Sequence, residues 1–287
     1  MFFKRLRKIG TGPERGTARR NEATPDIAVT TSENIILKSG NYTVEGYFYG
    51  KGRLVVTFEP DTDKKPGTEL RPGWGSTILR KNKVSHICVK PAESDWYQGA
   101  ELAEIFSHLR HKISEHSRVI TYGASMGGFA ALAYGDALGA HEVYAFDPQS
   151  TLHRPDVPWE KRFIKALPLD FTGPFGSAIG NFSTAEQVYI FLDWHTRDDR
   201  MHAERLRFDS VEYINIPYMG HGAAYAASAS GVMNHIVNGV MFGGLDKGKI
   251  YRDLHHGRRK VDRYAAEMKK RVAGRALFEK ILDTSLR

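Results

Sequence analysis

Short apolar runs without polar alternation recur along the chain, and they restrict its fold more than any other feature. Strands that are apolar on both faces need cover on both faces, which is typical of a parallel sheet between two helical layers. The runs span residues 54–58, 86–89, 119–122, 143–146, 189–192 and 213–216. Helical periodicity is present at residues 99–113, 126–138, 200–208, 223–240 and 261–282. This alternation predicts an α/β fold with a doubly wound, mostly parallel sheet.

Two segments depart from this alternation. Residues 35–38 and 42–49 are strand-like and flank Ser39-Gly40-Asn41, whose composition suits a tight turn, so we expect a hairpin before the parallel strands. Residues 148–187 contain five prolines and scattered aromatic residues, which is too long for an ordinary loop and too broken for a regular helix. We interpret this stretch as a small lid inserted between two strands.

Charge divides the chain into three parts. The 287 residues carry a formal net charge of +8, but residues 1–20 hold seven basic residues against one acid, and residues 246–287 hold thirteen against six. The remaining body has a net charge of −5. We therefore predict a basic flexible arm at 1–26, one folded domain at 27–245 with the lid at about 148–187, and a basic helical extension at 246–287.

Composition excludes several classes of protein. Cys88 is the single cysteine, so no disulfide framework or cysteine zinc cluster is expected, and no apolar run reaches the 18 residues of a membrane span. The sequence lacks nucleic-acid-binding motifs, so nucleic acid is not an expected partner. The basic ends permit weak contact with an anionic membrane surface. The default expectation is a cytoplasmic protein without a metal or other cofactor, whose oligomeric state stays open.

The most informative motif is Gly123-Ala124-Ser125-Met126-Gly127, which follows a β-branched run and precedes an alanine-rich helical segment. The pattern G-x-S-x-G in this strand-turn-helix context is typical of a nucleophile elbow, in which small neighbours let a serine occupy a strained turn at the end of a sheet. The helix that begins there directs free N–H groups at the site. Ser125 is thus the candidate nucleophile, and the N–H of Met126 is a candidate oxyanion donor.

With this elbow and with Gly220-His221-Gly222, the sequence resembles the α/β-hydrolase superfamily over about residues 30–242. Members have a serine on such an elbow, followed in chain order by an acid and a histidine. The chain is also similar to a loosely characterised bacterial subset that shares the Ser-Met-Gly-Gly elbow and a Pro-Gln after the next strand, here Asp147-Pro148-Gln149. The resemblance implies an α/β-hydrolase type of sheet and an ester-hydrolysing activity.

Position selects the histidine but leaves the acid open. His221 follows the last predicted strand in a glycine-flanked loop, where an open α/β sheet places its ligands, so it is the expected general base. Asp199 and Asp193 both follow the penultimate strand, where the resemblance places the acid. Asp199 is preferred because it lies past the strand end and next to a helix; Asp147 and Asp198 are less favoured alternatives.

The second oxyanion donor is expected after residues 54–58, where the chain reads Phe58-Glu59-Pro60-Asp61. Proline has no N–H, so Phe58 or Glu59 must donate. Two carboxylates beside a developing oxyanion would oppose catalysis unless they point away or bind the substrate. His195, Asp198, Asp199 and His202 are candidate metal ligands, but their spacing in the sequence is not that of a zinc site.

These features predict a serine hydrolase that cleaves a carboxylic ester, such as an acylated carbohydrate or another small acyl compound, with no cofactor. Two alternatives remain. A non-catalytic accessory or binding protein in surface-glycan synthesis or export would explain the acidic residues near Phe58. An acyltransferase would use the same Ser, His and Asp but pass the acyl group to an acceptor other than water.

Overall fold

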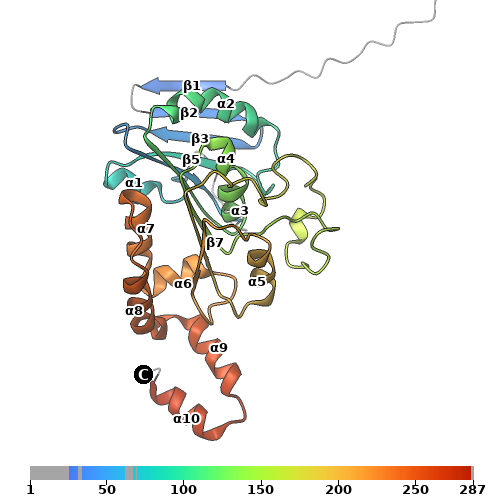
Figure 1. Cartoon of the computed structure of the whole chain (residues 1–287), viewed down its shortest axis with the longest axis vertical. Coiled ribbons are helices and arrows are strands. Elements are labelled where there is room, and N and C mark those ends of the chain that lie inside the picture. Colours follow the sequence, from blue (N-terminus) through green and yellow to red (C-terminus); the bar gives the residue numbers. More distant parts are fainter. Residues whose placement is uncertain (1–25, 32–33, 62–66, 69, 286–287) are drawn as a thin grey trace, which may run out of the picture.

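The computed structural model describes residues 26–285, apart from 32–33, 62–66 and 69, and its centre is one nine-stranded sheet (Figure 1). The order across the sheet is β1-β2-β3-β5-β4-β6-β7-β8-β9. The strands are β1 (Asp26–Thr31), β2 (Asn34–Ser39), β3 (Tyr42–Tyr47), β4 (Arg53–Phe58), β5 (Ser85–Pro91), β6 (Arg118–Ala124), β7 (Glu142–Phe146), β8 (Gln187–Leu192) and β9 (Val211–Asn215). The predicted α/β class with a mostly parallel sheet is confirmed.

The sheet has an antiparallel part and a parallel part. Strands β4 to β9 are mutually parallel, whereas β1, β2 and β3 pair antiparallel with one another and β3 pairs antiparallel with β5. The predicted hairpin is the β2–β3 pair, whose turn contains Gly40 with φ of 52°. Strand β1 was not expected. Of the predicted arm at 1–26, residues 1–25 lie outside the described part of the chain.

Helices cover both faces of the sheet and form two separate cores, as a doubly wound arrangement requires. One core joins α2 (Glu101–Ser114), α3 (Met126–Ala133) and α4 (Gly135–Leu138) to the sheet, together with residues of the 148–187 segment. The other joins α1 (Ser76–Lys81), α6 (Ala223–Ala229), α7 (Met233–Phe242) and α8 (Lys247–Gly257). Because all these crossovers start at the carboxyl ends of parallel strands, the loops there gather at one edge.

Several predicted helices were wrong in extent, mostly because turns interrupt their periodicity. The segment 126–138 is split at Tyr134 into α3 and α4, and 223–240 is split at Gly231, whose φ is 84°. Gly274, with φ of 79°, divides 261–282 into α9 (Asp262–Val272) and α10 (Ala276–Ser285). The helix predicted at 200–208 is α5 (Arg197–Glu204).

Two helices were missed. Helix α1 (Ser76–Lys81) is short, and α8 lies in the predicted basic extension but ahead of residues 261–282, where helical periodicity was recognised. Its amphipathic pattern is carried by Ile250 and Leu254, which are buried against the body, while Asp246 accepts a hydrogen bond from the backbone N–H of Lys249 at its start. None of the described helices is long and apolar enough to cross a bilayer.

The segment between β7 and β8 is an irregular insertion, as predicted. Its regular structure is limited to one 3₁₀ turn, Ile164–Ala166, and a bridge between Thr151 and Ser177. Buried side chains such as Phe171 and Phe182 tie it to the first core. The insertion thus starts at the carboxyl edge of the sheet, beside the loops that follow β6, β8 and β9, and ends at the opposite edge, where β8 begins.

Candidate active site

Ser125 lies on a strained turn between β6 and α3. Its backbone has φ of 52° and ψ of −117°, which L-residues rarely adopt, and its N–H donates to the carbonyl of Phe146 at 2.7 Å. The glycines explain why the turn can form. A Cβ on Gly123 would lie 2.1 Å from the carbonyl oxygen of Gly127, and one on Gly127 would lie 2.2 Å from that of Phe58. The sequence therefore encodes this turn locally.

The side chains of Ser125, His221 and Asp199 form one hydrogen-bonded chain. Ser125 Oγ lies 2.9 Å from His221 Nε2, and His221 Nδ1 lies 2.9 Å from Asp199 Oδ1. A carboxylate only accepts, so Nδ1 carries the ring hydrogen and Nε2 is left to accept from the serine hydroxyl. This is the tautomer that a general base requires.

Two of the other three candidate aspartates, Asp193 and Asp147, hold the histidine loop by its backbone. Asp193 Oδ2 accepts hydrogen bonds from the N–H groups of Met219 and Gly220, both at 2.8 Å. Asp147 Oδ2 accepts from the N–H of Ala223 at 2.6 Å, at the start of α6. Asp193 contacts neither ring nitrogen, so its geometry is that of a positioning residue.

Asp198 lies on the outer side of the first turn of α5, where its carboxylate faces solvent, Arg197 and Arg162. None of the aspartates after β8 caps this helix: the cap residue is Thr196, and its side chain makes no capping hydrogen bond.

Arg162, in the insertion, is a residue that sequence reasoning missed. Its Nη1 donates to Asp199 Oδ1 at 2.8 Å, the same oxygen that faces His221, and its guanidinium also binds the fully buried Glu160 at 2.6 Å. The next residue, Phe163, packs edge-on against the His221 ring with centroids 5.6 Å apart. The signal was absent from the sequence because Arg162 is 37 positions away from Asp199 and Phe163 is 58 positions away from His221.

At Asp199 and His221, charged neighbours shift the pKa in the direction opposite to the shift that burial causes. Burial raises the pKa of Asp199, but the hydrogen bond and charge of His221 and the charge of Arg162 outweigh it and hold that pKa below its ordinary value. Burial lowers the pKa of His221, but Asp199 and Asp147 raise it by more. The pKa of Asp147 rises to about 7, chiefly because this carboxyl is buried. One of its oxygens, Oδ1, has no partner among the described residues.

The structure places one candidate oxyanion donor, the N–H of Met126, and two candidates for the second. Met126 is the first residue of α3, where helix N–H groups have no intrahelical partner, and α3 runs away from Ser125. Phe58 is the last residue of β4, in register with Gly123, and Glu59 follows it. Both stay candidates for the second donor.

The acidic residues near Phe58 have partners, which answers the electrostatic objection raised by the sequence. The Glu59 side chain is buried and binds Arg71, with Nη2 and Oε2 2.8 Å apart. Asp61 accepts from the hydroxyl of Ser94 and lies 3.5 Å from Lys165 Nζ. Neither carboxylate is an isolated charge beside the serine.

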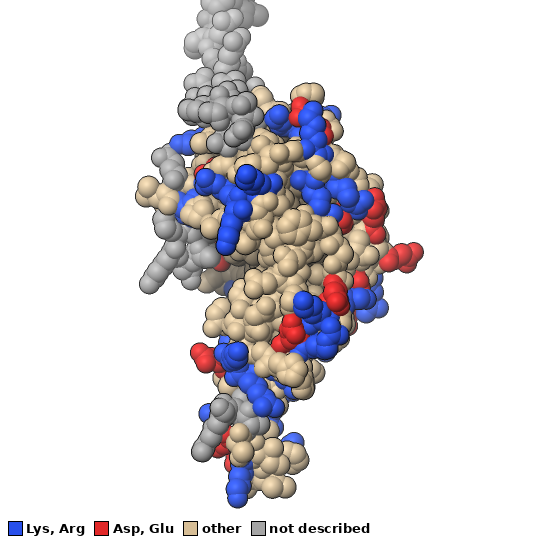
Figure 2. All heavy atoms as spheres, turned by 90° about the vertical axis from the view of Figure 1, so that its left-hand side faces the viewer, with Lys and Arg blue, Asp and Glu red and all other residues tan. Residues whose placement is uncertain are grey.

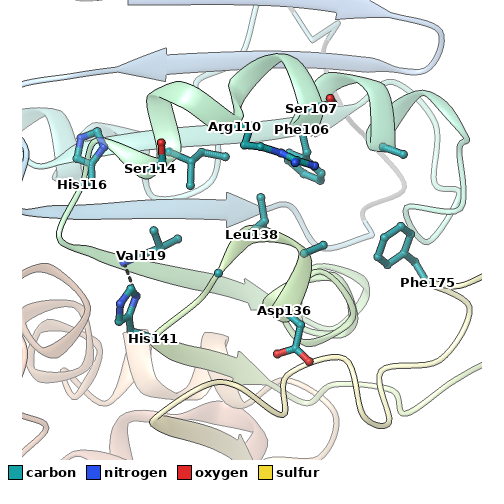
Figure 3. Close-up of a pocket in the computed structure, with 14 residues that line it drawn as sticks. Phe106, Ser107, Arg110, Ser114, His116, Val119, Asp136, Leu138, His141 and Phe175 are labelled. Atoms are coloured by element: carbon teal, nitrogen blue, oxygen red, sulfur yellow. Dashed lines mark hydrogen bonds between the residues drawn. The ribbon is translucent and has the colours of Figure 1, made fainter.

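A pocket of about 400 Å³ opens beside Ser125 and His221. Its walls include Trp74, Tyr225 and Met233, and Asp61 and Asp147 also reach it. A larger pocket of about 540 Å³ lies between α2 and α4 (Figure 3). No serine or cysteine of its lining is hydrogen-bonded to a histidine ring among the described residues, so the smaller pocket is the one that holds a candidate nucleophile and base.

The four candidate metal ligands His195, Asp198, Asp199 and His202 do not come together in one cluster. The His195 ring stacks on Tyr218 with centroids 4.3 Å apart, while His202 is buried and binds Ser150 and Glu160. One donor atom each from Asp147, Asp199 and His221 lie within 4.8 Å of one another. Both ring nitrogens of His221 are already engaged by Ser125 and Asp199.

No protein-family model and no curated protein sequence matches the chain. Among solved structures, it is similar to a variant of the capsule O-acetyltransferase of Neisseria meningitidis serogroup A in complex with CoA. The TM-score is 0.52 and the identity 12%, over 72% of this chain and 94% of that one. It is also similar to the fluorophosphonate-binding serine hydrolase F of Staphylococcus aureus, with a TM-score of 0.45 and 12% identity over 77% and 97% of the two chains. An alpha/beta hydrolase enzyme from a sediment metagenome of the Mar Chica lagoon, Morocco, gives a TM-score of 0.43 at 12% identity, over 71% and 97%.

At such identity a structural match concerns the fold alone. The parallel strands β4 to β9, the helices on both faces and the strained serine turn between β6 and α3 agree with it. The chain has the α/β-hydrolase fold.

Proposed function

We propose that this protein is a serine hydrolase that cleaves a carboxylic ester. The observation that carries the proposal is the hydrogen-bonded chain from Ser125 through His221 to Asp199, with both distances at 2.9 Å. Strand ends separated by up to 96 residues supply these three groups in the order that acyl-transfer chemistry needs.

In this mechanism Ser125 Oγ attacks the ester carbonyl carbon while His221 Nε2 takes the hydroxyl proton. Asp199 stabilises the imidazolium that forms, and Arg162 keeps Asp199 ionised. The N–H of Met126, with that of Phe58 or Glu59, binds the oxyanion. His221 then returns the proton to the leaving alcohol, and a water molecule activated by the same nitrogen releases the acid from Ser125.

The pocket favours a small or polar substrate over a long acyl chain. Its volume of about 400 Å³ is near the lower end of small-molecule sites, and Tyr225 in its wall is exposed to solvent. Aromatic rings with a nearby carboxylate, Asp61, suit stacking and hydrogen bonding to a hydroxyl-rich ring. An acylated carbohydrate therefore stays within the proposal, beside other small acyl compounds.

Acyl transfer is the second candidate. The same three groups would form the acyl-enzyme, and an acceptor hydroxyl would replace water in the second half-reaction. What favours considering it is the structural neighbour that is a capsule O-acetyltransferase crystallised with CoA. The accessory-protein alternative loses its main support. It was based on the acidic residues Glu59 and Asp61, and these form ion pairs with Arg71 and Lys165.

A panel of chromogenic esters from acetyl to decanoyl tests the proposal. We expect wild-type protein to hydrolyse the short esters fastest, and Ser125→Ala to lose roughly 10³-fold or more. Addition of sugar acceptors then separates the two candidates, because a transferase yields acylated sugar while a hydrolase yields only free acid. Equal rates for wild type and Ser125→Ala would reject both.

A further inference from the structure

The C-terminal helices α9 and α10 extend from the body of the molecule as a hairpin (Figure 1). Tyr264 is the buried residue that fixes α9 to the body, and α10 folds back so that Leu282 packs beside Val272. The outer face of α10 presents three large apolar side chains to solvent. Leu277 is 68% exposed, and Phe278 and Ile281 are each 54% exposed.

These exposed side chains need an explanation, because they are adjacent in space and not scattered. Residues 277, 278 and 281 share one side of the helix by its periodicity, and Leu282, four positions after Phe278, continues this side toward α9, where it is buried. A contiguous apolar face on an exposed amphipathic helix marks a contact with a lipid surface or another protein.

Charge distinguishes between these occupants. The hairpin holds more basic than acidic residues, six against four, so its net charge is +2: Arg263, Lys269, Lys270, Arg271, Arg275 and Lys280 against Asp262, Glu267, Glu279 and Asp283. Figure 2 shows Lys and Arg side chains, with Asp and Glu side chains among them, beside uncharged surface on the lower part of the molecule. A positively charged hairpin that presents Leu, Phe and Ile is complementary to a bilayer with anionic headgroups, each basic residue adding attraction near the surface.

The size of the patch agrees with a lipid surface better than with a second copy of this chain. A stable protein interface needs roughly 20–30 residues on each side, and three apolar residues on a thin hairpin offer far less. Two of the three side chains, Leu277 and Ile281, are aliphatic and give no advantage in binding nucleic acid, where aromatic stacking is used. We infer that the α9–α10 hairpin binds peripherally to anionic membranes, with Leu277, Phe278 and Ile281 entering the headgroup region.

This location has a consequence for the active site. Arg263 Nη1, at the start of α9, donates to the carbonyl oxygen of His221 at 2.9 Å, and Arg271 lies over the Tyr218 ring at 4.6 Å. The hairpin is thus attached directly to the loop that carries His221. A protein bound through α10 would hold this loop close to the lipid surface.

Vesicle sedimentation with full-length protein tests the inference. We expect wild type to bind phosphatidylcholine vesicles that contain 30% phosphatidylglycerol, and to bind pure phosphatidylcholine at least tenfold more weakly. The triple variant Leu277→Ser, Phe278→Ser, Ile281→Ser, and separately Lys269→Glu with Lys270→Glu, should each weaken binding roughly tenfold or more. All of these positions are exposed, so the variants should fold.

The matched controls change exposed apolar and basic side chains outside the hairpin. Ile164 and Leu167 are 69% and 57% exposed on the insertion, so Ile164→Ser with Leu167→Ser controls for lost apolar surface. Lys81→Glu with Lys83→Glu controls for charge. Both controls should bind like wild type, and so should Ser125→Ala, because the inference does not depend on catalysis.

Several results would overturn the inference. Absence of wild-type binding would do so, as would binding that the hairpin variants leave unchanged, which would assign the contact to the basic residues of 1–20. A wild type that is dimeric by light scattering, ignores vesicles and becomes monomeric as the triple serine variant would show self-association. Loss of binding to single-stranded RNA in the lysine variant, without vesicle binding by wild type, would show a nucleic-acid surface.

Discussion

The two sides of the active site are built in different ways. On one side, the turn that carries Ser125 is fixed by nearby backbone, because any Cβ at Gly123 or Gly127 would meet main-chain atoms at 2.1–2.2 Å. On the other side, His221 is held by side chains from three distant segments. Asp199 contacts its ring, Asp193 and Arg263 hold its loop, and Phe163 packs against it.

Ser125 is thus positioned by steric constraints, and His221 by charges and hydrogen bonds. The serine turn cannot accommodate added atoms at its glycines, but it depends on few residues. The histidine loop depends on buried carboxylates whose removal changes charge and hydrogen bonding while leaving space unchanged. Substitutions in the serine turn should therefore abolish activity, whereas substitutions around the histidine loop should reduce it to different degrees.

The largest effect is expected for Gly127→Ala. The new methyl group would lie 2.2 Å from the carbonyl oxygen of Phe58, and this backbone cannot move without disrupting β4. We expect esterase activity to fall below detection and the free energy of unfolding to drop by about 2–3 kcal/mol, measured by urea denaturation. The control is Gly173→Ala, where no atom lies within 4 Å of the added Cβ and both quantities should stay at the wild-type value.

Asp199→Asn should come second. The amide keeps the shape of the carboxylate but cannot stabilise the imidazolium, and it favours the wrong ring tautomer, so kcat should fall by roughly 10³ to 10⁴ with little change in folding. Steady-state kinetics and a thermal melt measure the two quantities. A loss smaller than tenfold would show that Asp199 is not the acid.

Asp193→Asn should cost less activity and more stability. The Asp193 carboxylate accepts three backbone N–H bonds, from His195, Met219 and Gly220, and an amide oxygen replaces only part of them. We expect kcat to fall roughly 10 to 100-fold and the free energy of unfolding by about 1–3 kcal/mol. An activity loss larger than that of Asp199→Asn would reverse the roles we assign to these two aspartates.

The smallest effect, and the most specific, is a shift of pH dependence in Arg162→Gln. Catalysis needs neutral His221, whose pKa is raised above 6.5, so kcat/KM of wild type should increase with pH through a value above 6.5. Arg162 opposes protonation of His221, and its removal should move this rise to still higher pH, with a several-fold loss near pH 7. A rise that stays in place would show that Arg162 has only a structural role.

The same contrast explains what the sequence could predict. Non-alternating strands and the elbow motif identified the sheet, Ser125 and its helix, because these depend on local periodicity and on glycine sterics. His221 could be inferred from its place after the last strand. Sequence position favoured Asp199 over Asp193 but left both open, since both follow β8 within six residues of each other and only the three-dimensional path of the histidine loop separates their contacts.

Arg162 and the Glu59–Arg71 pair were beyond sequence reasoning for the same reason. Nothing in the irregular insertion marks Arg162 as the partner of Asp199, 37 residues away. The helix ends at Tyr134, Gly231 and Gly274 were also missed, because apolar periodicity continued across each break.

The central claim is that His221 and Asp199 activate Ser125 as a nucleophile, and labelling with a fluorophosphonate probe tests it most directly. Peptide mass spectrometry should place the label on Ser125 in wild type, find none in Ser125→Ala, and find labelling slowed by roughly 10²-fold or more in His221→Ala. Wild-type protein that resists the probe, or a label that persists on another residue in Ser125→Ala, would contradict the account.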